Sequence, residues 1–183
     1  CNARLVMPET QLPSAKLQLF GEVIEELLES RHKALVFSQF VGHLNILREY
    51  LDEQKVGYQY LDGGTPARER KKRVTAFQAG EGDVFLISLK AGGTGLNLTA
   101  ADYVIHMDPW WNPAVEDQAS DRAHRIGQVR PVTIYRMVAR GTIEDRIVDL
   151  HHHKRDLADS LLDGTDISGR ISTEELLNLI REK

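Results

Sequence analysis

Hydrophobic and polar positions divide the chain into helical stretches and short apolar runs. Apolar residues recur at helical spacing from Leu17 to Leu28, after Ser14 as a good N-cap, and again through residues 41–54. A third helix is expected from Pro66, with Val74 and Phe77 as its core contacts. Short apolar runs are typical of buried parallel strands, and they occur at residues 33–38, 57–61, 83–88, 103–107 and 132–138.

The alternation of strands and helices predicts parallel βαβ units, and hence an α/β fold with an open, doubly wound and mainly parallel sheet flanked by helices. In such sheets the functional groups gather in loops at the carboxyl ends of the strands. The loops expected there are residues 38–40, 62–65, 90–95 and 108–111.

Three segments are expected along the chain. Residues 1–13 read as an extended lead-in, and residues 14–140 form the sheet domain. Residues 141–183 form a C-terminal helical appendage, with one helix running from about Thr142 to Leu162 and another after Ser172. Because the chain opens on Cys1 rather than methionine, we expect it to be part of a longer polypeptide.

The segment before Gly127 predicts a helix over residues 113–126. Asn112 is a good N-cap, Pro113 suits the first helical position, and Gly127 is a plausible stop.

On that helix Gln118, Arg122 and Arg125 would share one face, because they lie four and three residues apart. Two neighbouring arginines offer a planar array of donors suited to phosphate oxygens, as in an arginine-finger pair at a transferring phosphoryl group. The alternative is a solvated face with an Asp121–Arg125 surface ion pair.

The glycines at 92, 93 and 95 would let the backbone approach a phosphate closely. A tight turn before Leu96 explains them as well, and the loop fits neither common phosphate-binding glycine pattern. No Walker A sequence occurs in the chain.

Two further features point to nucleic acid. The basic cluster Arg68 to Arg73 suits a phosphate backbone, although a solvated helix face is the default for such a run. Trp110 and Trp111 could stack on or insert into nucleic acid, with one of them expected in the core.

Composition narrows the class of protein. Of 183 residues, 42% are hydrophobic and 27% charged, with a net charge of -4, so nucleic-acid binding would need a local patch. The single cysteine excludes an internal disulfide framework, and no run is long and apolar enough for a membrane span. We expect an intracellular protein without membrane contact.

Residues 151–153 are three histidines, but on a helix they diverge by about 100° per residue, so no metal site is assigned.

Five sequence blocks stand in a recognisable order. They are Lys-Ala-Leu-Val-Phe-Ser-Gln-Phe, Leu-Asp-Gly-Gly-Thr, Ser-Leu-Lys-Ala-Gly-Gly-Thr-Gly-Leu-Asn-Leu-Thr-Ala-Ala-Asp, Trp-Asn-Pro and Asp-Arg-Ala-His-Arg-Ile-Gly-Gln. Together they resemble the second RecA-like lobe of Swi/Snf-related ATPases, the double-stranded-DNA translocases of helicase superfamily two. The resemblance runs from about Lys33 to Leu162.

This resemblance implies a role for each matching residue. Arg122 and Arg125 would be catalytic, reaching the γ-phosphate of ATP. The matching residues of the ATP cleft are Gln39, Gly93, Gly95 and Gln118. The matching DNA-binding residues are Ser38, Gly63, Thr65, Arg70, Lys90, Gly92 and Trp111. The segment from Thr142 to Leu162 resembles the brace helix that returns toward the first lobe.

The resemblance also implies the partners. ATP with magnesium would be held mainly by an N-terminal RecA-like lobe that this chain lacks, so the fragment alone is expected to be inactive as an ATPase. Double-stranded DNA and that lobe are the expected partners. The expected location is the bacterial cytoplasm, with the nucleoid, or the eukaryotic nucleus, and Trp110 hints at a bacterial type.

A non-hydrolysing DNA- or protein-binding module derived from such a lobe is the alternative. An unrelated nucleotide-binding α/β enzyme, with Asp108 as the only acidic candidate near its ribose, is a weaker one.

Overall fold

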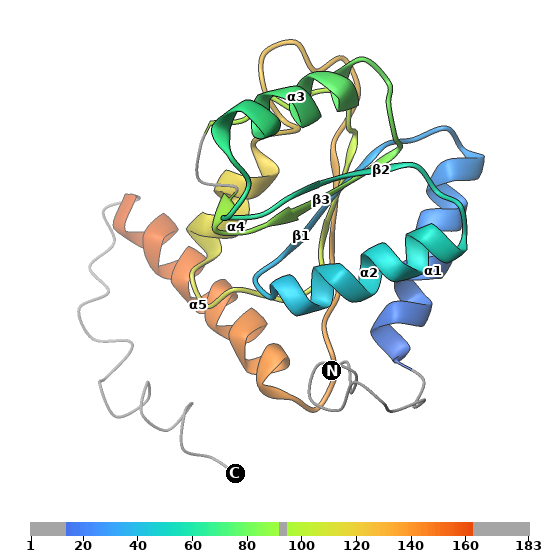
Figure 1. Ribbon diagram of the computed structural model, residues 1–183. Helices are drawn as coiled ribbons and strands as arrows, with labels where there is room; N and C mark the ends of the chain where they lie inside the picture. The colour runs from blue at the N-terminus through green and yellow to red at the C-terminus, as the bar shows by residue number, and fades with distance from the viewer. Residues whose placement is uncertain (1–13, 92–94, 163–183) are drawn as a thin grey trace. The chain divides into compact units, whose positions relative to one another are not determined.

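The computed structural model describes residues 14–91 and 95–162, with side chains described as far as Lys154. Its centre is a five-stranded sheet in the order β2-β3-β1-β4-β5, with every neighbouring pair parallel (Figure 1). The strands are β1 (Ala34–Ser38), β2 (Tyr58–Leu61), β3 (Val84–Ser88), β4 (Tyr103–His106) and β5 (Thr133–Arg136).

The strand order reverses at the middle of the sheet. The chain moves from β1 outward to β2 and returns through β3, and then continues on the other side of β1 with β4 and β5. This is the doubly wound arrangement that the sequence predicts, and the crevice beside the carboxyl end of β1 is its switch point.

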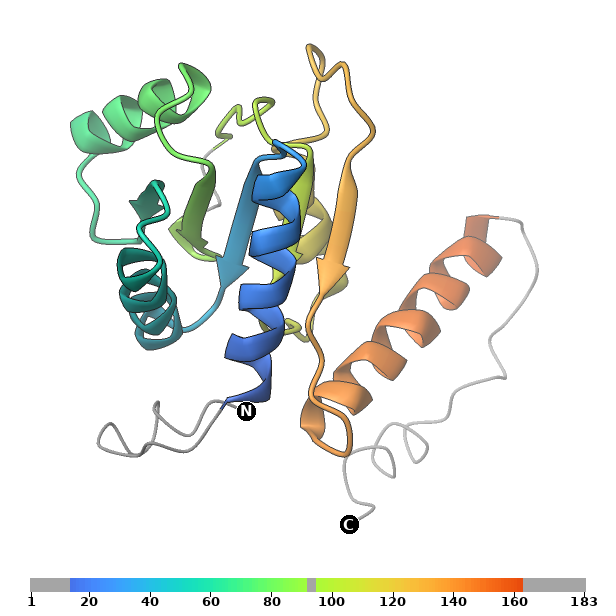
Figure 2. The same cartoon turned by 90° about the vertical axis from the view of Figure 1, so that its right-hand side faces the viewer.

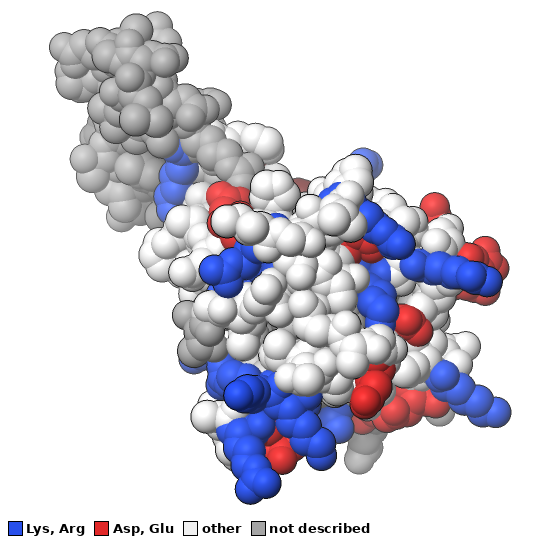
Figure 3. Space-filling view, turned by 90° about the horizontal axis from the view of Figure 1, so that it is seen from above, with Lys and Arg blue, Asp and Glu red and all other residues white. Residues whose placement is uncertain are grey.

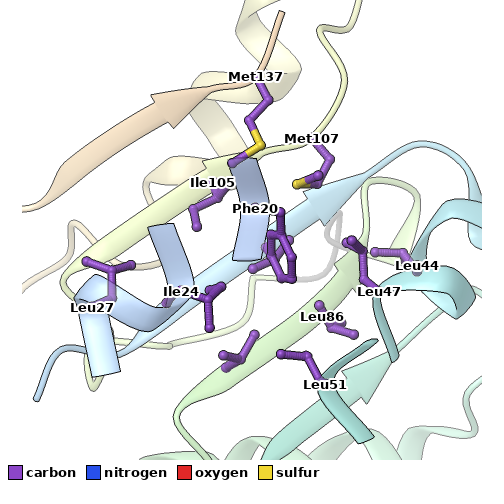
Figure 4. Packing of buried hydrophobic residues seen from close by; sticks show 13 residues of the cluster. Phe20, Ile24, Leu27, Leu44, Leu47, Leu51, Leu86, Ile105, Met107 and Met137 are labelled. Atoms are coloured by element: carbon purple, nitrogen blue, oxygen red, sulfur yellow. The ribbon is translucent and has the colours of Figure 1, made fainter. Parts of the chain in front are cut away.

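Helices cover both faces of the sheet (Figures 1 and 2). On one face α1 (Ala15–Glu29) and α2 (Val41–Glu53) pack through residues such as Phe20 and Leu47 on the buried side chains of the strands (Figure 4). On the other face α3 (Ala67–Gln78) and α4 (Pro113–Ser120) contribute Phe77 and Ala119 to a second buried cluster.

Side-chain bonds fix the start and the position of α1. The Ser14 hydroxyl accepts from the backbone N–H of Leu17 at 3.3 Å, which confirms the predicted N-cap. In the first turn of the helix, the buried ammonium of Lys16 donates to the carbonyl oxygen of Met107 at 2.8 Å, just past the end of β4. The helix is thereby tied to the end of the sheet where functional loops are expected.

The predicted helix over residues 113–126 is too long. Its start is correct, because the Asn112 side chain accepts from the backbone N–H of Ala114 at 3.2 Å, but α4 ends at Ser120. Beyond it the carbonyl oxygen of Arg122 accepts from the backbone N–H of Leu98 at 3.0 Å instead of continuing the helical ladder. A tertiary contact with a distant segment therefore ends the helix early.

The described residues fall into two compact units that divide between Ala139 and Arg140. In the second unit α5 (Ile143–Leu162) begins at Thr142, whose hydroxyl accepts from the backbone N–H of Glu144 at 3.2 Å. The Asp145 carboxylate in turn accepts from the backbone N–H of Gly141. In a capping box the side chains of Thr142 and Asp145 would each bond the other residue's backbone N–H, so the two observed bonds cap the helix with each of them moved by one residue. The predicted lead-in and the helix after Ser172 lie outside the described residues.

Candidate functional site

A pocket of about 470 Å³ brings together four of the residues predicted to face ATP, whereas the predicted Gln39 does not line it. Gln118 comes from the last turn of α4, Arg122 and Arg125 from the irregular segment after it, and Gly95 from the loop that leads from β3 to β4. These residues meet although the helix ends before both arginines, because the segment folds against the β3–β4 connection. The predicted Gly93 lies outside the described residues.

Arg122 is a buried cation in this pocket. Its side chain is only 4% exposed, and its Nε and Nη1 groups have no hydrogen-bond partner within the described part of the chain. Burial lowers the pKa of Arg122 from its ordinary value, the neighbouring charge of Arg125 lowers it further, and Asp121 partly opposes them. A buried guanidinium with unused donors costs several kcal/mol unless an anion pairs with it.

Arg125 lies at the surface of the same pocket. Its Nη1 group donates to the carbonyl oxygen of Gly95 at 3.2 Å, which fixes the guanidinium beside the glycine loop and leaves other donors for an incoming group. The alternative of a surface ion pair with Asp121 is not what the structure shows, since no such pair forms among the described residues.

Gln128 holds the arginine segment, residues 121–130, in place, and the sequence offers no separate signal for this role of Gln128. Its Nε2 group lies 2.7 Å from the carbonyl oxygen of Ala101 and 3.2 Å from those of Thr99 and Ala123. Its Oε1 atom accepts from the backbone N–H of Arg130 at 3.0 Å. One side chain therefore connects both ends of the segment to the β3–β4 connection.

A second anchor lies at the amino end of β4. The buried Asp102 carboxylate accepts from His32 and Arg130 at 2.7 and 3.2 Å, and from the backbone N–H of Lys33 at 3.2 Å. Although burial opposes ionisation, these hydrogen bonds keep the pKa of Asp102 below its ordinary value. The ionised carboxylate holds Arg130, and with it the end of the arginine segment, on the sheet.

The predicted residues Ser38 and Gln39 meet Asp108 at the switch point. The Ser38 hydroxyl donates to Oδ1 of Asp108 at 2.6 Å, the backbone N–H of Gln39 donates to Oδ2 at 2.8 Å, and Nδ1 of His43 lies 3.5 Å from Oδ1. Ser38 is fully buried, so its side chain does not reach the surface that DNA would meet. Its role here is to join the ends of β1 and β4. Asp108 also joins these two strand ends. This role differs from the contact with a ribose that the weaker alternative would give to Asp108.

The turn after β2 carries the predicted residues Gly63 and Thr65. The Asp62 carboxylate accepts from Thr65 Oγ1 and Gly64 N–H at 3.0 Å each, and from Tyr60 Oη at 2.9 Å. Burial opposes ionisation, but these bonds outweigh it and hold the pKa of Asp62 below its ordinary value. Burial and Asp62 raise the pKa of Tyr60 to about 12. The turn is fixed by its own side chains, with Gly63 exposed at the surface.

The loop after β3 is tied to α3 through a predicted DNA-binding residue. Arg70 donates from Nη1 to the carbonyl oxygen of Ala91 at 3.0 Å, so at least part of its guanidinium supports the loop. Lys90, next to Ala91, is exposed. The predicted Gly92 lies outside the described residues.

The two tryptophans separate as the sequence analysis expects. Trp110 is half-buried against the second core cluster, whereas Trp111 is 56% exposed. A fully buried carboxylate, Glu116, supports the loop that carries them, because it accepts from the backbone N–H of Trp110 at 2.8 Å and from Nε of Arg136 at 2.7 Å. In the sequence Glu116 has the features of an ordinary helix-surface residue, and nothing there marks it as buried.

Comparisons with known proteins agree with this architecture. Residues 15–127 match the family described as helicase conserved C-terminal domain. The chromatin-remodeling ATPase INO80 of Cryptococcus neoformans is 41% identical over 170 residues, which cover 92% of this chain and 10% of that protein. The putative ATP-dependent helicase/translocase YwqA of Bacillus subtilis is 42% identical over 168 residues, covering 91% of this chain and 18% of that protein.

A solved structure is similar as well. The C-terminal part of the Fun30 ATPase domain superposes with a TM-score of 0.72 and 34% identity, over 75% of this chain and 45% of that one. The chain therefore spans less than half of that structure, and a tenth to a fifth of the two curated relatives. By sequence and by fold, this chain belongs to the helicase conserved C-terminal domain family, as the second RecA-like lobe of a Swi/Snf-related member of helicase superfamily two.

Proposed function

We propose that this chain is the C-terminal motor lobe of an ATP-dependent double-stranded-DNA translocase or remodeller. The observation that carries the proposal is the buried guanidinium of Arg122, whose Nε and Nη1 groups have no partner among the described residues, in one pocket with the exposed Arg125. The names of its relatives, which include ATP-dependent helicases and a remodelling ATPase, support an ATP-hydrolysing parent protein.

The two arginines would act as arginine fingers. A transferring γ-phosphoryl group spreads negative charge over its oxygens, and cations aimed at it stabilise the transition state. Arg122 has donors that no described residue uses, and Arg125 lies at the pocket surface with one donor on Gly95. ATP and magnesium would be held mainly by an N-terminal RecA-like lobe, with Gln39, Gly95 and Gln118 completing the cleft.

DNA would meet the loops at the carboxyl ends of the strands. Lys90 is an exposed cation after β3, the Gly63–Thr65 turn presents backbone after β2, and Trp111 exposes an aromatic ring after β4. Cations would hold the phosphate backbone, and the ring offers a surface for contact with the duplex. Closing and opening of the nucleotide cleft would then move these loops along the DNA.

The DNA half of the proposal is tested with the full-length protein that contains this chain. We expect duplex DNA to stimulate steady-state ATP hydrolysis, and Lys90→Gln to raise the DNA concentration needed for half-maximal stimulation. Lys55→Asn is the matched control, because Lys55 is exposed and its φ of 57° suits asparagine. An ATPase rate indifferent to duplex DNA would favour a binding module over a motor.

A further inference from the structure

The outer face of α3 carries a stripe of cations, formed by Arg68, Lys71 and Lys72. Lys71 and Lys72 lie three and four positions after Arg68, so both lie on the side of the helix that carries Arg68, and all three are exposed. The helix has five basic residues and one acidic residue, Glu69, in a chain whose net charge is -4. Figure 3 shows Lys and Arg side chains gathered over this part of the surface. The positive charge is therefore local.

The inward-facing arginines of α3 bond to the rest of the fold. Arg70 donates to the carbonyl oxygen of Ala91, and Arg73 donates to that of Tyr60. Both bonds fasten the helix to the ends of β3 and β2.

The three outward-facing cations, by contrast, form no hydrogen bond or ion pair with any residue in the described ranges 14–91 and 95–154. Like charges at these spacings repel and slightly destabilise a helix. Folding therefore gains nothing from Arg68, Lys71 and Lys72 together, and an external anion would remove the repulsion.

The stripe borders the loops that are proposed above to meet DNA. The helix starts directly after the Gly63–Thr65 turn, and the bond from Arg70 to Ala91 places it beside the loop that carries Lys90. A cationic surface continuous with these loops suits a long polyanion better than a small ligand, because its charges are spread along a helix.

We propose that Arg68, Lys71 and Lys72 bind the phosphodiester backbone of duplex DNA through sequence-independent, salt-sensitive contacts. The inference rests on the proposed function and extends its DNA-binding surface from the strand-end loops to the outer face of α3. A stripe that is only solvated would leave DNA affinity unchanged, and so would a stripe that binds an acidic protein.

The experiment measures the affinity of the full-length protein for duplex DNA at increasing salt, without nucleotide. The variant Arg68→Gln/Lys72→Gln is compared with Arg31→Asn/Lys55→Asn, which removes one arginine and one lysine from exposed positions with φ near 56° and 57°. Each neutralised phosphate contributes about 0.9 to the slope of log affinity against log salt. The slope for the stripe variant should therefore be shallower by about 2. When the salt concentration rises fourfold, the factor by which the variant loses affinity should be about tenfold smaller than the factor for the wild type.

The outcomes separate the two claims. With the stripe contacting DNA, the control pair keeps the wild-type slope, and the stripe variant melts at or slightly above the wild-type temperature, which shows that it is folded. A stripe variant with the wild-type slope overturns the inference while the proposed function stands. A wild-type protein with no salt-dependent duplex binding overturns both.

Discussion

The side-chain amide of Gln128 donates to the carbonyl oxygen of Ala101 at 2.7 Å, and this contact fixes the arginine segment against the β3–β4 connection. The same Nε2 group also contacts the carbonyl oxygens of Thr99 and Ala123. Loss of the Gln128 amide would therefore remove the contacts that hold both ends of the arginine segment. The positions of Arg122 and Arg125 thus depend on a residue that does not line their pocket.

Gln128→Glu should be more harmful than Gln128→Ala. A carboxylate has no donor at neutral pH and would face three carbonyl oxygens, whereas alanine leaves room for water. We expect kcat for ATP to fall at least about tenfold in the full-length Gln128→Glu variant, since arginine misplacement acts on the transition state. DNA affinity, measured in parallel, should remain close to the wild-type value; equal kcat values for the two variants would contradict this role.

Trp110 and Trp111 should respond differently to truncation. Trp110→Ala removes a ring packed on the second core cluster and should lower the free energy of unfolding by about 2 to 4 kcal/mol, measured by urea denaturation. Trp111→Ala removes a largely exposed ring and should change stability little, but should weaken stimulation by DNA. Similar stability losses in the two variants would show that Trp111 is also part of the core.

Glu116→Ala should be among the most destabilising single changes in this domain. It leaves the half-buried Arg136 and the backbone N–H of Trp110 without their carboxylate, and the loss should approach the roughly 3 to 5 kcal/mol of a broken buried ion pair. Glu116→Gln keeps the shape and one acceptor, so a smaller loss is expected. Urea unfolding of both variants measures the difference, and equal losses would mean that the charge itself contributes nothing.

His106 should make stability depend on pH. Burial lowers the pKa of His106 to about 4, from an ordinary value of 6.5. Between pH 6.5 and pH 4, His106 therefore binds a proton more readily in the unfolded chain than in the folded one. The contribution of His106 to the free energy of unfolding is complete above pH 6.5 and is lost as the pH falls toward 4. The loss is on the order of 3 kcal/mol at pH 4, at 1.36 kcal/mol per unit.

A variant separates His106 from the carboxylates. Asp62 and Asp102 have pKa values below the ordinary 3.8, so their contributions are lost only at lower pH. His106→Asn should lower stability at pH 7 but remove most of the slope between pH 6.5 and pH 4. A slope identical to that of the wild type would assign the dependence to other groups.

The strands were predictable because their signal is local. Each apolar run that predicted a strand contains the observed one within a residue or two, and the loops that follow lie at the carboxyl ends as expected. The order of the strands, however, comes from long-range pairing such as that of Ala34 with Val84 and Tyr103.

The candidate site was predictable in its residues but not in its support. The motif positions Gln118, Arg122 and Arg125 meet in one pocket, but the early end of α4 depends on a bond from Leu98, which helix propensity does not register. Asp108 joins two residues about 70 positions away, so its partners follow from the sheet and not from local sequence.

The central claim concerns the two arginines, and one measurement tests it most directly. In the full-length protein we would compare kcat for ATP, at saturating ATP and duplex DNA, among the wild type, Arg122→Ala, Arg125→Ala and the control Arg31→Asn. The account predicts a fall of about 10³ to 10⁵ for the two pocket arginines, with duplex affinity retained and the control unaffected. Near-normal turnover in Arg125→Ala, with the protein folded and bound to DNA, would contradict the assignment of this pocket to the transferring phosphate.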